Sequence, residues 1–190
     1  MANITIIYHS GRGHTKKLAE SVLTGVRLSE NVNASMLSIN EFTEKDWETL
    51  NEADAIIFGT PTYMGGVSAE FKKFADSTSK IWYQEKWKNK ISAGFTNSSS
   101  MNGDKLSSLQ YLWTLAQQHG MIWVGLGLLP SSTKAATRND VNYLGSFSGL
   151  FSQSPSDSSA EEGPLGDLKT AELFGTRVSE LTKQFVRGKI

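Results

Sequence analysis

The alternation of apolar and polar positions predicts five short strands separated by helices. Short runs rich in apolar residues recur at residues 4–8, 34–39, 55–59, 92–95 and 122–126. Runs that are apolar on consecutive residues are typical of strands covered on both faces. Because each step between parallel strands needs a crossover, the alternation predicts an α/β fold with a parallel sheet between two layers of helices.

The segments between these runs carry apolar residues every three or four positions, which is typical of helices with one buried face. Four such stripes are distinct, at residues 18–26, 67–78, 109–116 and 168–185, and a weaker one surrounds Trp47 and Leu50. We interpret the stripes as core packing. A chain of 190 residues has the length of one domain, so residues 1–190 are predicted to form a single unit.

Residues 131–165 break this rhythm. The segment is polar and rich in serine, and it carries isolated aromatic side chains such as Tyr143, Phe147 and Phe151. Long connections of this kind are usually functional loops or mobile linkers. We interpret this one as a long loop or flap that is partly mobile, with its tip near residues 156–162.

Charge and composition exclude several classes of function. Nineteen basic and nineteen acidic residues give a net charge of zero, so the chain is not expected to bind nucleic acid or a membrane surface. Cysteine is absent, which excludes disulfides and thiolate chemistry, and three scattered histidines predict no metal site. The first apolar run is too short for a signal peptide. We therefore expect a soluble, cytoplasmic protein.

Three loops follow predicted strands and are dense in Gly, Ser, Thr and Asn: SGRGHT at 10–15, TPTYMGG at 60–66 and TNSSSMNG at 96–103. In a parallel sheet the carboxyl ends of the strands meet at one edge, where ligands bind. These loops are therefore the candidate binding site.

The first loop is suited to an anion. Gly11 and Gly13 allow backbone N–H groups to converge, and Thr15 opens a helix whose N-terminal dipole favours negative charge. The alternative is a tight strand–helix turn with Thr15 as its N-cap. The spacing fits neither a P-loop nor the dinucleotide motif, so a terminal monophosphate suits it better than a nucleoside triphosphate.

The other two loops describe the rest of the ligand. Pro61, Tyr63 and Met64 stand beside two glycines, which permits the close approach of a flat ring, and Asn97 begins a run of polar donors. A phosphate at one end and a planar heterocycle at the other indicate FMN.

Longer stretches then carry a resemblance to a known family. IIYHSGRGHTKKLAE, ADAIIFGTPTYMGGVSAEFKKFADSTSKIW, LAQQHGMIWVGLG and GDLKTAELFGTRVSEL, in that order, resemble the WrbA-type flavodoxin-like NAD(P)H:quinone oxidoreductases. The resemblance implies a flavodoxin-like, doubly wound sheet of five strands in the order 2-1-3-4-5, with three layers. It also implies non-covalent FMN and two-electron reduction of quinones by NADH or NADPH.

Matched by position, the resemblance assigns each loop a role. The phosphate would be held by Ser10, Gly11, Arg12, Gly13, His14 and Thr15, the ring would be lined by Pro61, Thr62, Tyr63, Met64, Gly65 and Gly66, and its polar edge would meet Thr96, Asn97, Ser98, Ser99, Ser100, Asn102 and Gly103. The chain departs from WrbA at Arg12, at Tyr63 and in the stretch NSSSMN, which leaves the nucleotide preference and the substrate open.

Trp82 and His119 match family positions beside the open face of the flavin, where they would form the substrate pocket. His119 would polarise or protonate an acceptor oxygen. The alternatives are that His119 interacts with the end of its helix beside Gly120, and that Trp82 packs against its aromatic neighbours. Both interpretations stay open at this point.

The leading hypothesis is an FMN-dependent oxidoreductase that passes two electrons from NAD(P)H to a quinone or another flat aromatic acceptor. Exposed aromatic residues favour a homodimer or homotetramer. One alternative is a flavodoxin-like electron carrier that docks to redox protein partners, and another is a flavin-free interaction module on the same fold.

Overall fold

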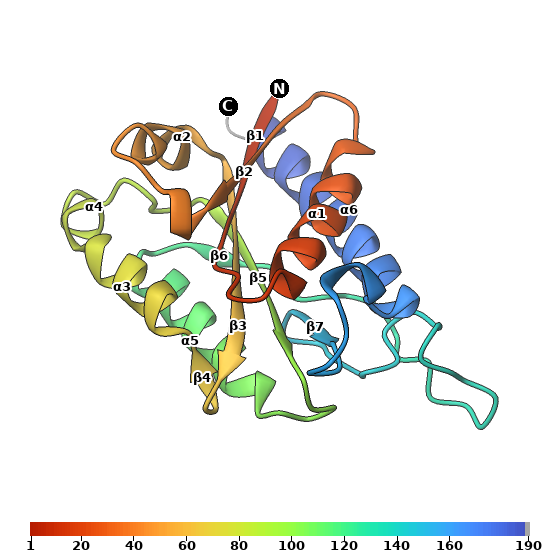
Figure 1. The fold of residues 1–190 in the computed structure, drawn as a ribbon. Coiled ribbons are helices and arrows are strands. Elements are labelled where there is room, and N and C mark those ends of the chain that lie inside the picture. The colour runs from red at the N-terminus through yellow and green to blue at the C-terminus, as the bar shows by residue number, and fades with distance from the viewer. Residues whose placement is uncertain (189–190) are drawn as a thin grey trace.

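The computed structural model describes residues 1–188 as a three-layer α/β structure (Figure 1). The sheet consists of strands β2 (Val32–Ser38), β1 (Ala2–Tyr8), β3 (Ala55–Tyr63), β5 (Ile91–Ser98) and β6 (Ile122–Trp123), in that order and all parallel. The short strand β4 (Gly66–Val67) pairs antiparallel with the end of β3. Without that hairpin strand, the order is 2-1-3-4-5, which confirms the predicted flavodoxin-like fold.

The last position of the sheet is filled by two separate segments. Strand β6 pairs only with Ile91 and Ser92 at the start of β5, and β7 (Leu150–Gln153) pairs with the end of β5, also in parallel. The strand expected at residues 122–126 is therefore shorter than predicted. The segment expected as a long loop at 131–165 contains β7 and a short 3-10 helix, η2 (Ala160–Glu162).

Helices cover both faces of the sheet (Figure 1). Helices α1 (His14–Arg27) and α6 (Leu165–Arg187) cover one face; η1 (Ile39–Glu41), α2 (Asp46–Glu52), α3 (Ala69–Ser77), α4 (Ser79–Tyr83) and α5 (Lys105–Gln118) lie on the other. A Cβ atom added at Gly25 or Gly175 would overlap the backbone of the facing helix, so these glycines allow α1 and α6 to pack closely.

Alternate residues of each central strand feed the two cores. In β1, Ile4 and Ile6 join the core beneath α1 and α6, whereas Ile7 joins the core beneath the other helices. Ile57 and Phe58 of β3 are divided in the same way. This period of two follows from the pleat of a strand. Because both faces of the sheet are covered by helices, the central strands are apolar on consecutive residues.

The parallel strands give the sheet two chemically different edges. We call the edge at Tyr8, Tyr63 and Ser98 the carboxyl edge, and the edge at Ala2, Ala55 and Ile91 the amino edge. Helices α1, α3, α5 and α6 begin near the carboxyl edge and run toward the amino edge (Figure 1). The N-terminal ends of these helices therefore gather at the carboxyl edge.

Candidate functional site

A cleft of about 400 Å³ opens at the carboxyl edge, and all three loops identified in the sequence contribute to it. Its lining from these loops consists of Gly11, Arg12, His14, Thr15, Pro61, Thr62, Tyr63, Asn97, Ser98 and Ser99. Three further residues, Ser154, Pro155 and Ser156, complete the lining. The structure thus brings together segments more than eighty residues apart in one cleft.

The first loop turns directly from β1 into α1. Gly13 is the N-cap of the helix and has a φ of 89°, a left-handed conformation that favours glycine. The Oγ atom of Ser10 accepts hydrogen bonds from the backbone N–H groups of Gly13 (3.1 Å) and Lys16 (3.2 Å). Thr15 lies buried in the first turn, so the interpretation of Thr15 as the N-cap is wrong.

The same loop presents positive charge and an unpaired polar atom. Arg12 is exposed, and the first turn of α1 carries no acidic residue that would compete with a bound anion. The Nδ1 atom of His14 is buried and has no hydrogen-bond partner among residues 1–188. An anion at this end of the cleft would meet the helix dipole and the guanidinium group.

The second loop is a tight hairpin between β3 and β4. Met64 (φ 49°) and Gly65 (φ 77°) both have positive φ, as a two-residue hairpin turn requires. The Tyr63 side chain extends from this hairpin over the first loop, where its Oη atom would lie 2.5 Å from a Cβ atom added at Gly11. Tyr63 is half exposed and thus offers an aromatic surface to the cleft.

Beneath the second and third loops lies a buried cluster of hydroxyl groups. The Oγ1 atom of Thr62 is 2.7 Å from Thr96 Oγ1 and 2.7 Å from Ser108 Oγ. Thr96 is fully buried and does not line the cleft. Because these hydroxyl groups bond to one another, they fix β3 to β5 and α5, and only Thr62 also lines the cleft.

The predicted residues outside the lining remain in the same three loops. Ser10, Gly13, Met64, Gly65, Gly66, Thr96, Ser100, Asn102 and Gly103 belong to the loops but are not part of the cleft surface. Among them, Gly13, Met64 and Gly65 have positive φ and so shape the first two loops. Residues 99–103, named here the ring-edge loop, carry most of the polar atoms that follow β5.

Ser154, Pro155 and Ser156 were missed by the sequence analysis. They follow β7, which ends beside the end of β5. Ser154 Oγ donates to Asn97 Oδ1 (3.1 Å), and Gln153 Nε2 donates to the carbonyl oxygen of Ser99 (2.7 Å). The signal in the sequence was the serine run directly after the apolar pair Leu150 and Phe151, which reads as a strand followed by a site loop.

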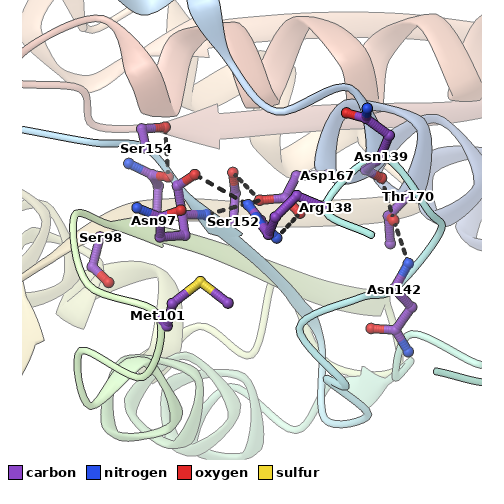
Figure 2. A network of polar contacts seen from close by, with 12 residues as sticks. Asn97, Ser98, Met101, Arg138, Asn139, Asn142, Ser152, Ser154, Asp167 and Thr170 are labelled. Carbon is purple, nitrogen blue, oxygen red and sulfur yellow. Dashed lines mark hydrogen bonds and ion pairs between the residues drawn. The ribbon is translucent and has the colours of Figure 1, made fainter. Parts of the chain in front are cut away.

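A buried ionic network supports this wall of the cleft (Figure 2). Asp167, in the first turn of α6, accepts both arms of the Arg138 guanidinium group, at 2.9 and 2.7 Å. It also accepts from the Ser152 hydroxyl (3.1 Å) and from the backbone N–H of Gln153 (2.9 Å). One carboxylate thus ties residue 138, β7 and α6 together behind the cleft.

The segment after β7 returns to the first loop. Ala160, in η2, lies against Gly13, because a Cβ atom on that glycine would come within 2.9 Å of the Ala160 Cβ. Lys17 of α1 forms an ion pair with Glu161. Residues 154–162 therefore run from the third loop to the phosphate end of the cleft.

The structure does not bring Trp82 and His119 to the cleft. Trp82 lies in α4 and His119 directly follows α5, so both stand at the amino edge. Helix α5 has 14 residues and spans about 21 Å at 1.5 Å per residue. These two residues line a separate surface hollow of about 290 Å³ with Thr78 and Tyr111.

His119 is buried and paired within its own chain. Its Nε2 atom lies 2.9 Å from Thr78 Oγ1, and its ring lies 4.5 Å from the Trp87 ring. Because the Thr78 hydroxyl donates to the carbonyl of Ala75, it accepts from Nε2–H, which leaves Nδ1 without a proton. Burial lowers the pKa of His119 to about 4, so the ring is neutral at pH 7.

Two classes of site find no support in the described part of the chain. Among residues 1–188, no group of three or more His, Cys, Asp or Glu side chains is arranged to hold a metal ion. Within the same residues, none of the helices has the length and apolar character needed to cross a membrane.

Comparison with known proteins adds three similarities. The family model described as NADPH-dependent FMN reductase matches residues 3–135. Flavodoxin FldP of Pseudomonas aeruginosa is 46% identical over 187 residues, which cover 97% of this chain and 98% of that protein. An NAD(P)H dehydrogenase (quinone) of Archaeoglobus fulgidus is 30% identical over 206 residues, which cover 97% of this chain and 99% of that protein.

A solved structure agrees with these relatives. The flavodoxin, WrbA-like protein from Agrobacterium tumefaciens superposes with a TM-score of 0.77 at 44% identity, covering 97% of this chain and 99% of that one. The similarity extends over the β6–β7 region as well as the first three strands, because nearly the whole of both chains is covered.

Proposed function

Because the chain belongs to the WrbA-type, flavodoxin-like family of FMN oxidoreductases, we propose that it binds FMN in the carboxyl-edge cleft and passes two electrons from NADH or NADPH to a quinone-like acceptor. The observation that carries the proposal is the cleft itself, which joins the turn into α1 to an aromatic and polar lining from the other two loops. A phosphate at the turn and a flat ring beside that lining fit this arrangement.

The phosphate end would hold the charged tail of the cofactor. The N-terminus of α1 contributes its dipole, and Arg12 contributes a formal charge that no residue of the first turn offsets. Ser10 now occupies the N–H groups of Gly13 and Lys16 with its Oγ atom, so a phosphate would take its place on these donors.

The ring end would orient the flavin. Pro61 and Tyr63 supply flat apolar surface, while Asn97, Ser98 and Ser99 supply polar groups at the opposite wall. FMN, when bound, supplies the atoms that accept a hydride from a nicotinamide nucleotide and return two electrons to an acceptor. The protein's part is to fix the ring, exclude water from one face and leave the other face open.

We further propose that a second copy of the chain completes the site. Trp82 is 44% exposed and Tyr83 is 83% exposed, so the amino edge presents aromatic surface beside the hollow that contains His119. These residues cannot reach the cleft of their own chain, whereas a neighbouring copy could place them over it. His119 would then take part as a neutral ring, because its pKa is far below 7.

One measurement discriminates this function from the electron-carrier alternative, which the similarity to a flavodoxin keeps open. The protein is loaded with FMN, titrated anaerobically with NADPH and NADH, and then mixed with a quinone. Rapid bleaching by a nicotinamide nucleotide and steady quinone turnover support the oxidoreductase. Tight FMN binding without reduction by either nucleotide would instead support a carrier that needs a protein donor.

A further inference from the structure

The ring-edge loop encloses a fully buried lysine to which the proposed function assigns no role. Lys105, the first residue of α5, is 0% exposed. Its Nζ atom donates hydrogen bonds to three successive backbone carbonyl oxygens, those of Ser100 (2.6 Å), Met101 (2.9 Å) and Asn102 (3.2 Å). A lysine so deeply buried is uncommon in proteins and calls for a physical reason.

The lysine fixes the direction of the loop's N–H groups. In a trans peptide the C=O and the following N–H point in opposite directions. Since three carbonyl groups face the ammonium group, the N–H groups of Met101, Asn102 and Gly103 point to the outer side of the loop. Among residues 1–188, no backbone acceptor is found for these N–H groups. Successive N–H groups of this kind bind oxygen atoms that carry negative charge.

Lys105 also adds a positive charge that no carboxylate contacts directly. Asp167 is occupied by the two arms of Arg138, and Lys105 instead meets carbonyl oxygens and the Phe151 ring, 5.9 Å away. The charged groups that face Lys105 are therefore Asp167, which attracts its proton, and Arg138, which repels it. Together the three groups carry a net charge of +1 behind the polar wall of the cleft.

Burial, the largest cause, lowers the pKa of Lys105 to about 8. The side chain is therefore charged at pH 7 and loses its charge as the pH rises through 8. The same proton on Lys105 therefore determines the local charge and supports the hydrogen bonds that hold the loop.

We propose that Lys105 positions the ring-edge loop against the polar edge of the flavin and stabilises the reduced form of the cofactor. The inference rests on the proposed binding of FMN in this cleft. If a nicotinamide nucleotide transferred a hydride to bound FMN, its two electrons and one proton would leave the neutral ring with one negative charge unless a second proton followed. A fixed positive charge behind the polar wall, where Ser98 and Ser99 line the cleft, would favour that charge.

The expected size of the effect follows from Coulomb's law. One unit charge acting over about 10 Å, with an effective dielectric constant of about 20, changes an equilibrium by roughly tenfold. The Lys105→Met variant should therefore bind reduced FMN roughly tenfold more weakly, relative to oxidised FMN, than the wild type does. For a two-electron couple this equals a midpoint potential lower by about 30 mV.

The experiment measures the midpoint potential of bound FMN by anaerobic dye equilibration in the wild type, Lys105→Met and Lys90→Met. Lys90 is a matched control, because its Nζ also donates to backbone carbonyls, those of Asn51 (2.7 Å) and Ala53, but at the amino edge. Lys90→Met should lower the stability of the fold without shifting the potential. Equal potentials in the wild type and Lys105→Met would overturn the proposal.

Two further arms keep the test decisive. Lys105→Gln replaces Lys105→Met if the latter does not fold, with the same expected shift. In the wild type alone, the midpoint potential of bound FMN should fall more between pH 7 and pH 9.5 than the midpoint potential of free FMN does. A potential of bound FMN that follows that of free FMN over this range would count against Lys105. A wild type that binds no FMN would instead refute the proposed function.

Discussion

The carboxyl and amino edges of the sheet both carry residues that match family positions in the sequence, yet they differ in how their polar groups are used. At the carboxyl edge, the Nδ1 atom of His14 and the N–H groups of the ring-edge loop lack backbone or side-chain partners, and Arg12 is exposed. At the amino edge, His119 is buried against Trp87 and its Nε2 atom is bonded to Thr78, although its Nδ1 atom, like that of His14, has no partner among residues 1–188. The first edge is prepared for a ligand, whereas the second is a packed surface with exposed aromatic residues.

Order along the chain does not decide which residues share a site. Gly11, Pro61 and Asn97 meet because parallel strands end at one edge. His119 directly follows α5, and that helix carries the chain across the sheet to the opposite edge. A single chain therefore supports a cofactor site at one edge and a contact surface at the other.

The largest loss of stability is expected from a substitution in the ionic network behind the carboxyl-edge cleft. Asp167→Asn leaves the half-buried Arg138 without its charge partner and weakens the bonds to Ser152 and Gln153. We expect a loss of about 1.5–3 kcal/mol in the free energy of unfolding, typical of losing hydrogen bonds to a charged group. Urea denaturation measures this loss, and FMN titration should show weaker binding.

The control for that variant is Glu85→Gln, which breaks the exposed pair between Glu85 and Lys88. Exposed pairs contribute about 0–1 kcal/mol. If both variants lose the same small amount of stability, Asp167 does not hold the wall and the account of this edge is wrong.

The second prediction uses the pH dependence of stability to test whether His119 is buried as a neutral ring at the amino edge. The pKa of His119 is about 4 in the folded protein and about 6.5 in the unfolded chain. Between these values the unfolded chain binds a proton that the folded protein does not, so stability is lost as the pH falls from 6.5 to 4. The loss amounts to about 3 kcal/mol.

Urea midpoints of the wild type and His119→Gln at pH 7 and pH 4.5 measure this term. The variant should lose less stability on acidification than the wild type, although its stability at pH 7 is lower because the bond to Thr78 changes. Parallel pH profiles for the two proteins would show that His119 is not kept neutral by burial.

A third effect sharpens the description of the phosphate end. Gly13→Ala forces an alanine to a φ of 89° and brings its Cβ within 2.9 Å of Ala160. We expect a loss of about 1–2 kcal/mol in stability and a smaller preference for FMN over riboflavin. Titration with both flavins measures the preference.

Gly66→Ala is the stability control for this variant, since nothing lies within 4 Å of a Cβ atom added there. Its unfolding free energy should stay within about 0.5 kcal/mol of the wild type. An unchanged FMN-to-riboflavin preference in Gly13→Ala would mean that the phosphate does not bind at this turn.

The smallest effect concerns the exposed surface of the amino edge. Trp82→Ala removes a side chain that is 44% exposed, so the stability should change little. If a second copy places Trp82 beside the open face of the flavin, the KM for a quinone rises roughly threefold, typical of losing one aromatic contact. Steady-state kinetics and light scattering test this; an unchanged KM and a monomeric mass would refute the role of a second copy.

Much of the fold could be predicted because its signals are local. The apolar run of β3 and the stripe of α1 each specify an element within a few residues, and the crossover rule then fixes a parallel sheet. The first loop was located for the same reason, since Gly11 and Gly13 stand directly between a strand and a helix.

The remaining part of the site depends on contacts distant in sequence. Strand β7 is four residues long, and its place beside β5 depends on Asp167 reaching Arg138, 29 residues earlier. No periodicity in residues 131–165 encodes that bond. The serine-rich wall at 154–156 and the buried environment of Lys105 were therefore visible only in the structure.

Amide hydrogen exchange with and without FMN tests the central claim most directly, because it reports where on the chain the cofactor binds. The account predicts that FMN slows exchange in residues 10–15, 97–103 and 154–156 together. Binding of FMN that leaves these three segments unprotected, or that protects only the segments around Trp82 and His119, would contradict it.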